Sequence, residues 1–167
     1  MRAMNAVSSR SQLLDAAHAA FIQGPVSVIV ASRNAEQVPD VVRGCGCRVS
    51  RDRRQVTVLI EPARASSLLD DVAGNGLIAV VFSQPSTHRT IQLKGDDARV
   101  VPVTAADRAA VRRHQQQWCA DLTSIGYGPA FAVAVHGGTG QLAAIRFTPT
   151  AAFQQTPGPG AGQPLRG

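Results

Sequence analysis

The sequence of 167 residues has few aromatic side chains, almost no lysine and no long apolar run. Aromatic residues make up 4% of it, so a core has to rest on Val, Ile, Leu and Ala, a composition that suits a compact sheet or barrel. Lys94 is the single lysine among 17 basic residues, and we interpret the net charge of +6 as a general surplus of arginine plus a local anion site. No run of basic residues alternates with stacking aromatics, which argues against nucleic-acid binding.

The three cysteines, Cys45, Cys47 and Cys119, are too few for a disulfide framework. A Cys-x-Cys pair without a second Cys/His cluster is a poor tetrahedral zinc site, so we expect buried thiols and no metal. Residues 1–10 lack the apolar stretch of a secretory signal, and no segment has the length of a membrane span. These absences predict a soluble, cytoplasmic protein without a membrane partner.

The length and the Pro and Gly positions predict one folded domain. A chain of this size buries roughly two-thirds of its unfolded surface and needs no covalent or metal crosslink. We assign residues 1–153 to this domain, with an N-terminal helix at about residues 11–23 that Ser11 caps. Residues 154–167 are rich in Pro and Gly and are predicted to be a C-terminal arm without helix or sheet.

Short apolar or alternating runs between turn residues indicate strands. We predict strands at residues 26–31, 38–50, 55–61, 77–82, 88–94 (extended by 99–103), 131–136 and 141–148, the last two joined by a tight turn at residues 137–140. Helices are predicted at residues 63–73 after Pro62 and at residues 104–122 with Thr104 as cap, and Trp118 is assigned to the core. Six or seven strands in hairpins with three helices predict a mainly β fold, an antiparallel barrel with helices packed outside.

The run from His88 to Gly95 is the most informative stretch. Its polar side chains, Thr90, Gln92 and Lys94, fall on one face of the predicted strand, and its apolar ones on the other. A half-buried strand with a cationic, hydrogen-bonding face is suited to line a site for an anionic ligand.

Two other stretches offer groups that bind a phosphate. Arg43 and Arg48 flank a Gly-Cys-Gly-Cys run, whose glycines are predicted to hold a β-bulge or to let a ligand approach the backbone. Arg64 lies where Pro62 begins a helix, and the unpaired N–H groups and the dipole of a helix N-terminus favour an anion.

The order of these segments, ending in Arg-Thr-Ile-Gln-Leu-Lys-Gly, resembles the FMN-binding split-barrel proteins related to pyridoxamine 5′-phosphate oxidase. The resemblance covers about residues 24–95. It implies a six-stranded antiparallel split β-barrel with flanking helices, which binds flavin mononucleotide (FMN) at the two-fold interface of a homodimer. Arg64 matches the first member of a basic pair of the family, and Ala65 replaces the second. Arg89 matches the start of the family's ring-edge strand, and Thr90 stands where the oxidases have Gln.

The resemblance assigns two groups of residues to the flavin. The phosphate side comprises Arg43, Arg48, Arg64 and Ser66, with the backbone of Gly44 and Cys45 running along the ring. The ribityl chain and ring edge are assigned to Thr87, His88, Arg89, Thr90 and Gln92. His88 is also a candidate general acid, although a loop histidine with local hydrogen bonds is an equal interpretation.

The resemblance implies a flavin-dependent oxidoreductase acting on an unidentified small substrate. The oxidase itself is not expected, because the C-terminal segment that carries its Trp and Arg has no counterpart after Phe153. Two alternatives stay open. One is a non-catalytic flavin- or heme-binding or sensing protein, and the other is a deazaflavin-dependent reductase on the same fold.

Overall fold

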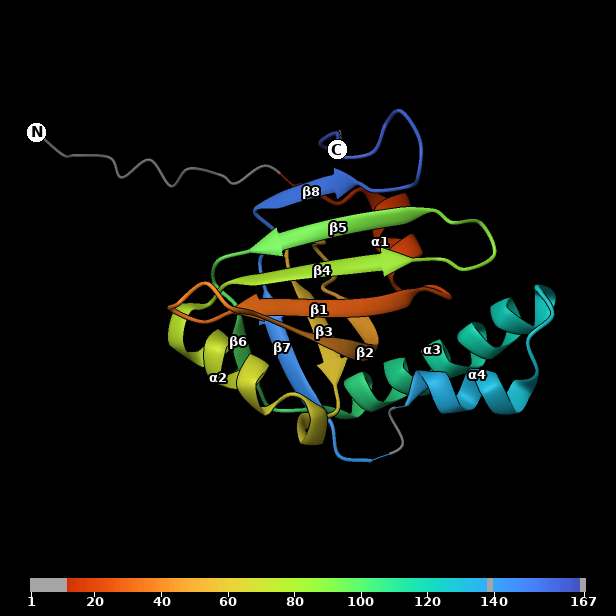
Figure 1. Ribbon diagram of the computed structural model, residues 1–167, viewed down its shortest axis with the longest axis horizontal. Coiled ribbons are helices and arrows are strands. Elements are labelled where there is room, and N and C mark those ends of the chain that lie inside the picture. Colours follow the sequence, from red (N-terminus) through yellow and green to blue (C-terminus); the bar gives the residue numbers. More distant parts are fainter. Residues whose placement is uncertain (1–11, 138–139, 166–167) are drawn as a thin grey trace, which may run out of the picture.

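The computed structural model of the protein describes residues 12–137 and 140–165. Its helices and strands follow one another along the chain as shown in Figure 1. They are α1 (Ala16–Ile22), β1 (Ser27–Arg33), β2 (Pro39–Val49), β3 (Val56–Ile60), the short 3-10 helix η1 (Pro62–Arg64), α2 (Ser66–Asn75), β4 (Ile78–Ser83), β5 (Thr90–Gly95), β6 (Arg99–Val101), α3 (Ala105–Ser124), α4 (Pro129–His136), β7 (Ala143–Phe147) and β8 (Ala151–Gln154).

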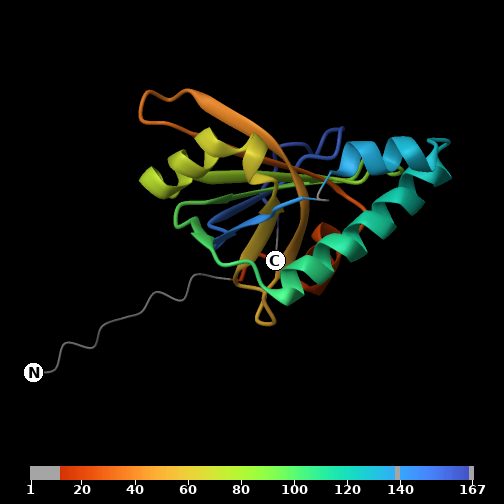
Figure 2. The same ribbon diagram turned by 90° about the horizontal axis from the view of Figure 1, so that it is seen from below.

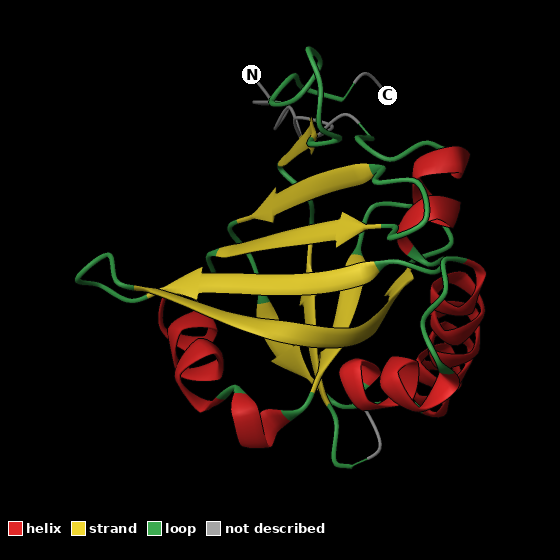
Figure 3. Cartoon of the chain, turned by 45° about the vertical axis from the view of Figure 1, so that its right-hand side comes forward, coloured by secondary structure: helices red, strands yellow, loops and turns green. Residues whose placement is uncertain are grey.

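The strands form one eight-stranded sheet in the order β6-β7-β3-β2-β1-β4-β5-β8, in which each neighbouring pair is antiparallel. The predicted fold class, an antiparallel split-barrel sheet with flanking helices, is confirmed. The predicted number of six strands is wrong, because β8 adds a strand at one edge and β6 is separate from β5. The sheet curves so that one of its faces encloses the core (Figure 3).

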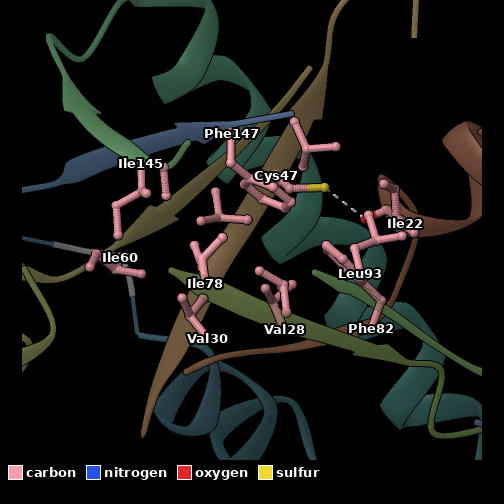
Figure 4. Packing of buried hydrophobic residues seen from close by; sticks show 14 of the residues in the cluster. Ile22, Val28, Val30, Cys47, Ile60, Ile78, Phe82, Leu93, Ile145 and Phe147 are labelled. Atoms are coloured by element: carbon pink, nitrogen blue, oxygen red, sulfur yellow. Dashed lines mark hydrogen bonds between the residues drawn. The ribbon is translucent and has the colours of Figure 1, made fainter. Parts of the chain in front are cut away.

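The core follows from the alternation of side chains along the strands. In β1, Val28 and Val30 point inward and are fully buried, whereas Ile29 between them is half-buried on the outer face. Figure 4 shows inward side chains of β1, β2, β3, β4, β5 and β7 packed with Ile22 of α1. The Cys47 thiol donates a hydrogen bond to the Ile22 carbonyl at 2.9 Å, which fixes the end of α1 to β2, and burial raises the pKa of this thiol.

The outer face of β1, β4, β5 and β8 has no described helix in front of it (Figure 1). Helix α2 lies at one end of the sheet, and α3 with α4 lies at the other (Figure 3). The outer face therefore presents the side chains that alternate away from the core, such as Thr90, Gln92 and Lys94.

Residues 131–136 form a helix, so the predicted strand and its hairpin with residues 141–148 are wrong. Helix α4 begins with Pro129 at its first turn and packs beside α3 (Figure 2). Its buried residues are Ala132 and His136, four apart on one helical face, whereas Phe131 is 49% exposed. The Trp118 indole donates to the Ala132 carbonyl at 3.1 Å, and Trp118 is a core residue as predicted. Strand β7 pairs with β3 and β6 instead, and residues 138–139 of the predicted turn lie outside the described residues.

The C-terminal segment folds back on the sheet. Residues 155–165 form turns and one isolated bridge. Strand β8 pairs with β5, and Phe153 forms a bridge with Pro164. The Gln154 amide donates to the Gln163 carbonyl at 2.9 Å, and the Leu165 amide donates to the Ala152 carbonyl at the same distance. These hydrogen bonds hold the segment against its own chain.

The N-terminal helix is shorter than the predicted 11–23. Helix α1 has Asp15 as its N-cap, and the Asp15 carboxylate accepts the His18 N–H at 2.7 Å. Ser11, the predicted cap, lies outside the described residues. Among the described helices, none combines the length and the apolar character needed to cross a membrane.

Candidate functional site

The candidate site is a cavity of about 480 Å³ between β2, the turn after β3 and helix α4. Its wall carries Arg43 from β2, Glu61 and Arg64 from the turn, and His136 from α4. The two arginines are 21 positions apart in the chain but meet because β2 and β3 are antiparallel neighbours in which Gly44 pairs with Ile60. The sheet register thus brings two of the predicted phosphate-binding residues to one pocket.

Both guanidinium groups are accessible from this pocket. Arg43 is exposed and donates from Nη1 to the Ser27 hydroxyl at 2.9 Å. The Arg64 side chain is 85% exposed, with its Nε 3.8 Å from Glu61 Oε2. A contact of that length with an exposed partner restrains a guanidinium only weakly. Two cations against one carboxylate leave the pocket positive, which favours an anionic ligand.

Starting at Arg43, one residue on each of four neighbouring strands forms a row across the outer face of the sheet. Arg43 pairs with Ile29, Ile29 with Val81, and Val81 with Gln92. Four neighbouring strands place Arg43 and Gln92 about 14 Å apart, with two half-buried apolar side chains between them. Predicted site residues Arg43 and Gln92 therefore lie on the same face.

Hydroxyl groups form a second row beside the first. Ser27, which accepts from Arg43, pairs with Ser83 across β1 and β4. The Ser83 and Thr90 hydroxyls are 2.8 Å apart, and the Thr90 amide donates to the Thr156 hydroxyl at 2.9 Å. Thr90, another predicted site residue, is thus part of a polar row that begins at Arg43.

The Gly-Cys-Gly-Cys run forms the predicted β-bulge, between Gly44 and Gly46. Gly46 has a φ of 140°, and a Cβ there would lie 3.1 Å from the Cβ of His114 on α3. A Cβ at Gly44 would lie 2.7 Å from a methyl carbon of Val28. The glycines of this run therefore allow close packing of α3 and β1 in the described structure.

Replacing Gly46 with Ala is expected to lower the free energy of unfolding by about 2 kcal/mol, because the backbone conformation disfavours a side chain and His114 leaves no room. Chemical denaturation measures the change. Gly74→Ala is the matched control: no atom lies within 4 Å of its Cβ position inside α2, so stability should stay equal or rise by up to about 1 kcal/mol. Equal losses in both variants would contradict the packing role of Gly46.

Cys45 forms part of the pocket wall and is 2% exposed. Burial, and after it the charge of Glu61, raises the pKa of its thiol to about 12. The thiol is therefore protonated at neutral pH, and it contributes a neutral surface rather than a nucleophile. Within the described residues, no group of three or more His, Cys, Asp or Glu side chains is arranged to hold a metal ion.

Arg48 forms an ion pair and is not among the described residues that line the pocket. Its Nε lies 2.8 Å from Oδ1 of Asp107, which is fully buried at the start of α3. The same carboxylate accepts the amide and the hydroxyl of Thr104, which caps α3 as predicted. Arg48 therefore anchors α3 to β2 in the structure.

Three predicted residues lie in the turn between β4 and β5. The Thr87 hydroxyl donates to Gln84 Oε1 at 3.3 Å, and His88 has a φ of 58° and is exposed. The Arg89 guanidinium carbon lies 4.3 Å from the centroid of the Phe21 ring of α1. Strand alternation places Arg89 on the side opposite to Thr90. Ser66, the first residue of α2, is exposed close to Arg64 in the chain.

Two histidines at the pocket were not predicted as site residues. His136 lines the pocket at 3% exposure, and its Nε2 is 2.8 Å from Nδ1 of His114. His114 Nε2 is 2.8 Å from the Val26 carbonyl, and His136 Nδ1 is 2.7 Å from the Gly137 carbonyl. Burial lowers the pKa of both imidazoles, that of His114 to about 4. The sequence gives no signal for this pair, since its members are 22 positions apart on two helices.

Comparisons with known proteins identify the fold. No protein-family model matches the sequence, and no curated protein matches it. A solved structure from Lactobacillus delbrueckii, described as a candidate pyridoxamine 5′-phosphate oxidase, superposes with a TM-score of 0.53 at 10% identity, over 86% of this chain and 95% of that one. HupZ from Group A Streptococcus superposes with a TM-score of 0.50 at 15% identity, over 82% of this chain and 90% of that one. A variant of HupZ gives a TM-score of 0.51 at 14% identity, over 83% and 97%. At these identities the likeness shows a shared fold.

Proposed function

We propose, from the split-barrel fold that this chain shares with pyridoxamine 5′-phosphate oxidase-like proteins, that it binds FMN and takes part in redox chemistry on a small substrate. The convergence of Arg43 and Arg64 on one pocket is the observation that carries this proposal. Bound flavin would supply hydride or electron transfer, and the residues of this chain would hold and orient it.

The pocket suits the phosphate end of the ligand. Arg43 and Arg64 offer planar N–H forks, the geometry that recognises phosphate oxygens. Helix α2 begins at Ser66, two residues after Arg64, and its N-terminus has no side-chain cap, an arrangement that favours an anion beside Ser66. Arg48 is paired with Asp107, so we assign the phosphate to the other two arginines.

The outer face of the sheet suits the rest of the ligand. A ribityl chain is matched by hydroxyls, and Thr90 belongs to the row of hydroxyls that starts at Arg43. A flavin ring requires apolar surface with a few polar groups at its edge, and Ile29 and Val81 provide that surface next to Gln92. Phosphate, ribityl and ring groups are therefore available in sequence on one surface.

A second copy of the chain would cover the flavin. The outer face carries no described helix, and Val41 and Val133 at the pocket are 58% and 43% exposed. Exposed apolar side chains of this kind are typical of interfaces. Arg89 lies over Phe21 of α1 in its own chain, so we leave it out of this flavin site.

The test is to purify the protein, record its visible spectrum and the mass of any bound ligand, and then titrate the ligand-free protein with FMN. We expect a yellow protein or a saturable quenching of FMN fluorescence, together with the mass of a dimer in light scattering. A monomer that binds neither FMN nor a deazaflavin would contradict the proposal. A different bound chromophore would identify the deazaflavin or heme alternative by its spectrum.

One observation favours a second candidate, flavin carriage without turnover. The thiol and the imidazole of the described pocket wall are already engaged: the Cys45 thiol is buried with a raised pKa, and both ring nitrogens of His136 have partners. His88 lies in the β4–β5 turn, apart from the pocket wall. A nicotinamide oxidation assay separates the two candidates, since steady turnover of the flavin-loaded protein indicates an enzyme and its absence indicates a carrier.

A further inference from the structure

A continuous chain of polar contacts runs from the sheet to the pocket wall. It begins at the Val26 carbonyl, passes through the rings of His114 and His136, and ends at the Gly137 carbonyl. A carbonyl oxygen accepts hydrogen bonds and never donates them. His114 must therefore carry a proton on Nε2, and His136 must carry one on Nδ1, for the two outer contacts to be hydrogen bonds.

The middle contact needs a third proton. The two ring nitrogens that face each other are 2.8 Å apart, so one of them has to carry a hydrogen. Two neutral imidazoles hold two protons in total, and this chain requires three. The fully hydrogen-bonded pair is therefore a cation with one charge shared between His114 and His136.

The surroundings set how firmly the third proton is held. The charged groups that face the pair are Arg113 on the α3 side of His114, and Glu61 and Arg43 on the pocket side of His136. Burial, followed by the repulsion between the rings, lowers the pKa of His114, so a fourth proton is excluded near neutral pH. Burial also lowers the pKa of His136, and the Gly137 carbonyl and Glu61 oppose it. The pair therefore binds the third proton more weakly than a free histidine does.

Without the third proton, one contact has to fail. The contacts of His114 with Val26 and with His136 are buried, whereas the contact of His136 with Gly137 is only partly buried. Two protons satisfy the first two contacts and leave a lone pair of His136 Nδ1 facing the Gly137 oxygen. Gly137 lines the pocket. The number of protons on the two histidines therefore affects both the contact that holds this part of the pocket wall and the charge beside the pocket.

We propose that His114 and His136 are positioning residues of the anion site, and that they take up one shared proton when an anion binds between Arg43 and Arg64. This inference rests on the proposed function for the identity of the pocket. An anion next to the pair stabilises the cationic form, and by linkage the cationic form binds the anion more tightly. Affinity for an anion should therefore rise as the pH falls through the range in which the pair is protonated.

Sulfate is a suitable probe because it keeps both charges between pH 5.5 and pH 8, whereas a phosphate loses charge with a pKa of about 6. We expect the sulfate affinity of the native protein to rise severalfold as the pH falls across this range, because the pair takes up its shared proton together with the anion. In His136→Gln the sulfate affinity should lack this rise between pH 8 and pH 5.5, whatever its absolute value at pH 8. A parallel pH profile in both proteins would overturn the proposal.

Nuclear magnetic resonance of the histidine ring nitrogens tests the same inference on the native protein, should the variant not fold. With sulfate at pH 6.5, three protons are expected on the four ring nitrogens, with His114 Nε2 and His136 Nδ1 both protonated. Two protons in the sulfate-saturated protein would overturn the inference. If neither sulfate nor FMN binds at any pH, the proposed function fails. An acid titration of the free protein that passes directly from two protons to four would then overturn the shared proton independently.

Discussion

Replacing both Arg43 and Arg64 with Ala is expected to weaken FMN binding by at least about tenfold. The two guanidinium groups line the same pocket, and the Arg64 side chain is 85% exposed. A hydrogen bond to a charged group contributes about 1.5–3 kcal/mol, so each single substitution should weaken binding between about tenfold and somewhat over a hundredfold. The double variant loses both contacts with one ligand, and its affinity should fall at least as far as the larger single effect.

The dissociation constant of FMN, measured by fluorescence quenching in each variant, checks this expectation. Arg51→Ala is the control, because Arg51 is an exposed arginine in the turn between β2 and β3 and its loss changes the net charge as much as each single substitution does. It should leave the affinity almost unchanged at physiological salt, where distant exposed charges are screened. An unaltered dissociation constant in the double variant would place the phosphate elsewhere.

Replacing Asp107 with Ala is expected to destabilise the protein by about 3–5 kcal/mol. Asp107 is fully buried and accepts from Arg48 and from two groups of Thr104, so the substitution removes a helix cap and leaves a half-buried guanidinium without its partner. Chemical denaturation followed by circular dichroism measures the loss. Asp70→Ala on the exposed side of α2 is the control and should change stability by no more than about 0.5 kcal/mol.

The same residue gives the stability a defined pH dependence. Burial would raise the pKa of Asp107, but the hydrogen bonds from Thr104 and the Arg48 guanidinium outweigh it and lower the pKa. A carboxyl with a lowered pKa stabilises the folded state above its unfolded pKa, and this contribution is lost as the pH falls through the folded value. In Asp107→Asn the acid-induced loss of stability below about pH 4 should be smaller than in the native protein. An identical loss of stability at low pH in Asp107→Asn and in the native protein would show that Asp107 is not the group responsible.

The strands and the long helix were predictable because their signals are local. β1, β3 and β4 are apolar or alternating runs between turn residues, and α3 begins at the Thr104 cap as expected. Helix α4 was not, because Phe131, Val133 and Val135 alternate as in a strand, whereas the face that α4 buries carries Ala132 and His136. Strand β8 has no β-branched residue that would indicate a strand, and it is extended because it pairs with β5.

The candidate site was predictable in part for the same reason. Arg43 and Arg64 were indicated by their place in the order of segments, and the register of β2 with β3 brings them together. The partner of Arg48 lies 59 positions away, and the ring beneath Arg89 belongs to α1, so a sequence alone does not show that their side chains are engaged. The pairing of His114 with His136 depends on how α3 and α4 pack, which the incorrect strand at residues 131–136 had hidden.

The folded-back C-terminal segment limits how copies of the chain can associate. An edge strand with free amide and carbonyl groups invites another strand to add to it, a route to open-ended polymers. In this protein residues 162–165 occupy that position along β8, through hydrogen bonds to Ala152 and Gln154. Growth of the sheet by strand addition at β8 is therefore blocked. The broad surface that carries Arg43 and Gln92 is left for the dimer that we propose.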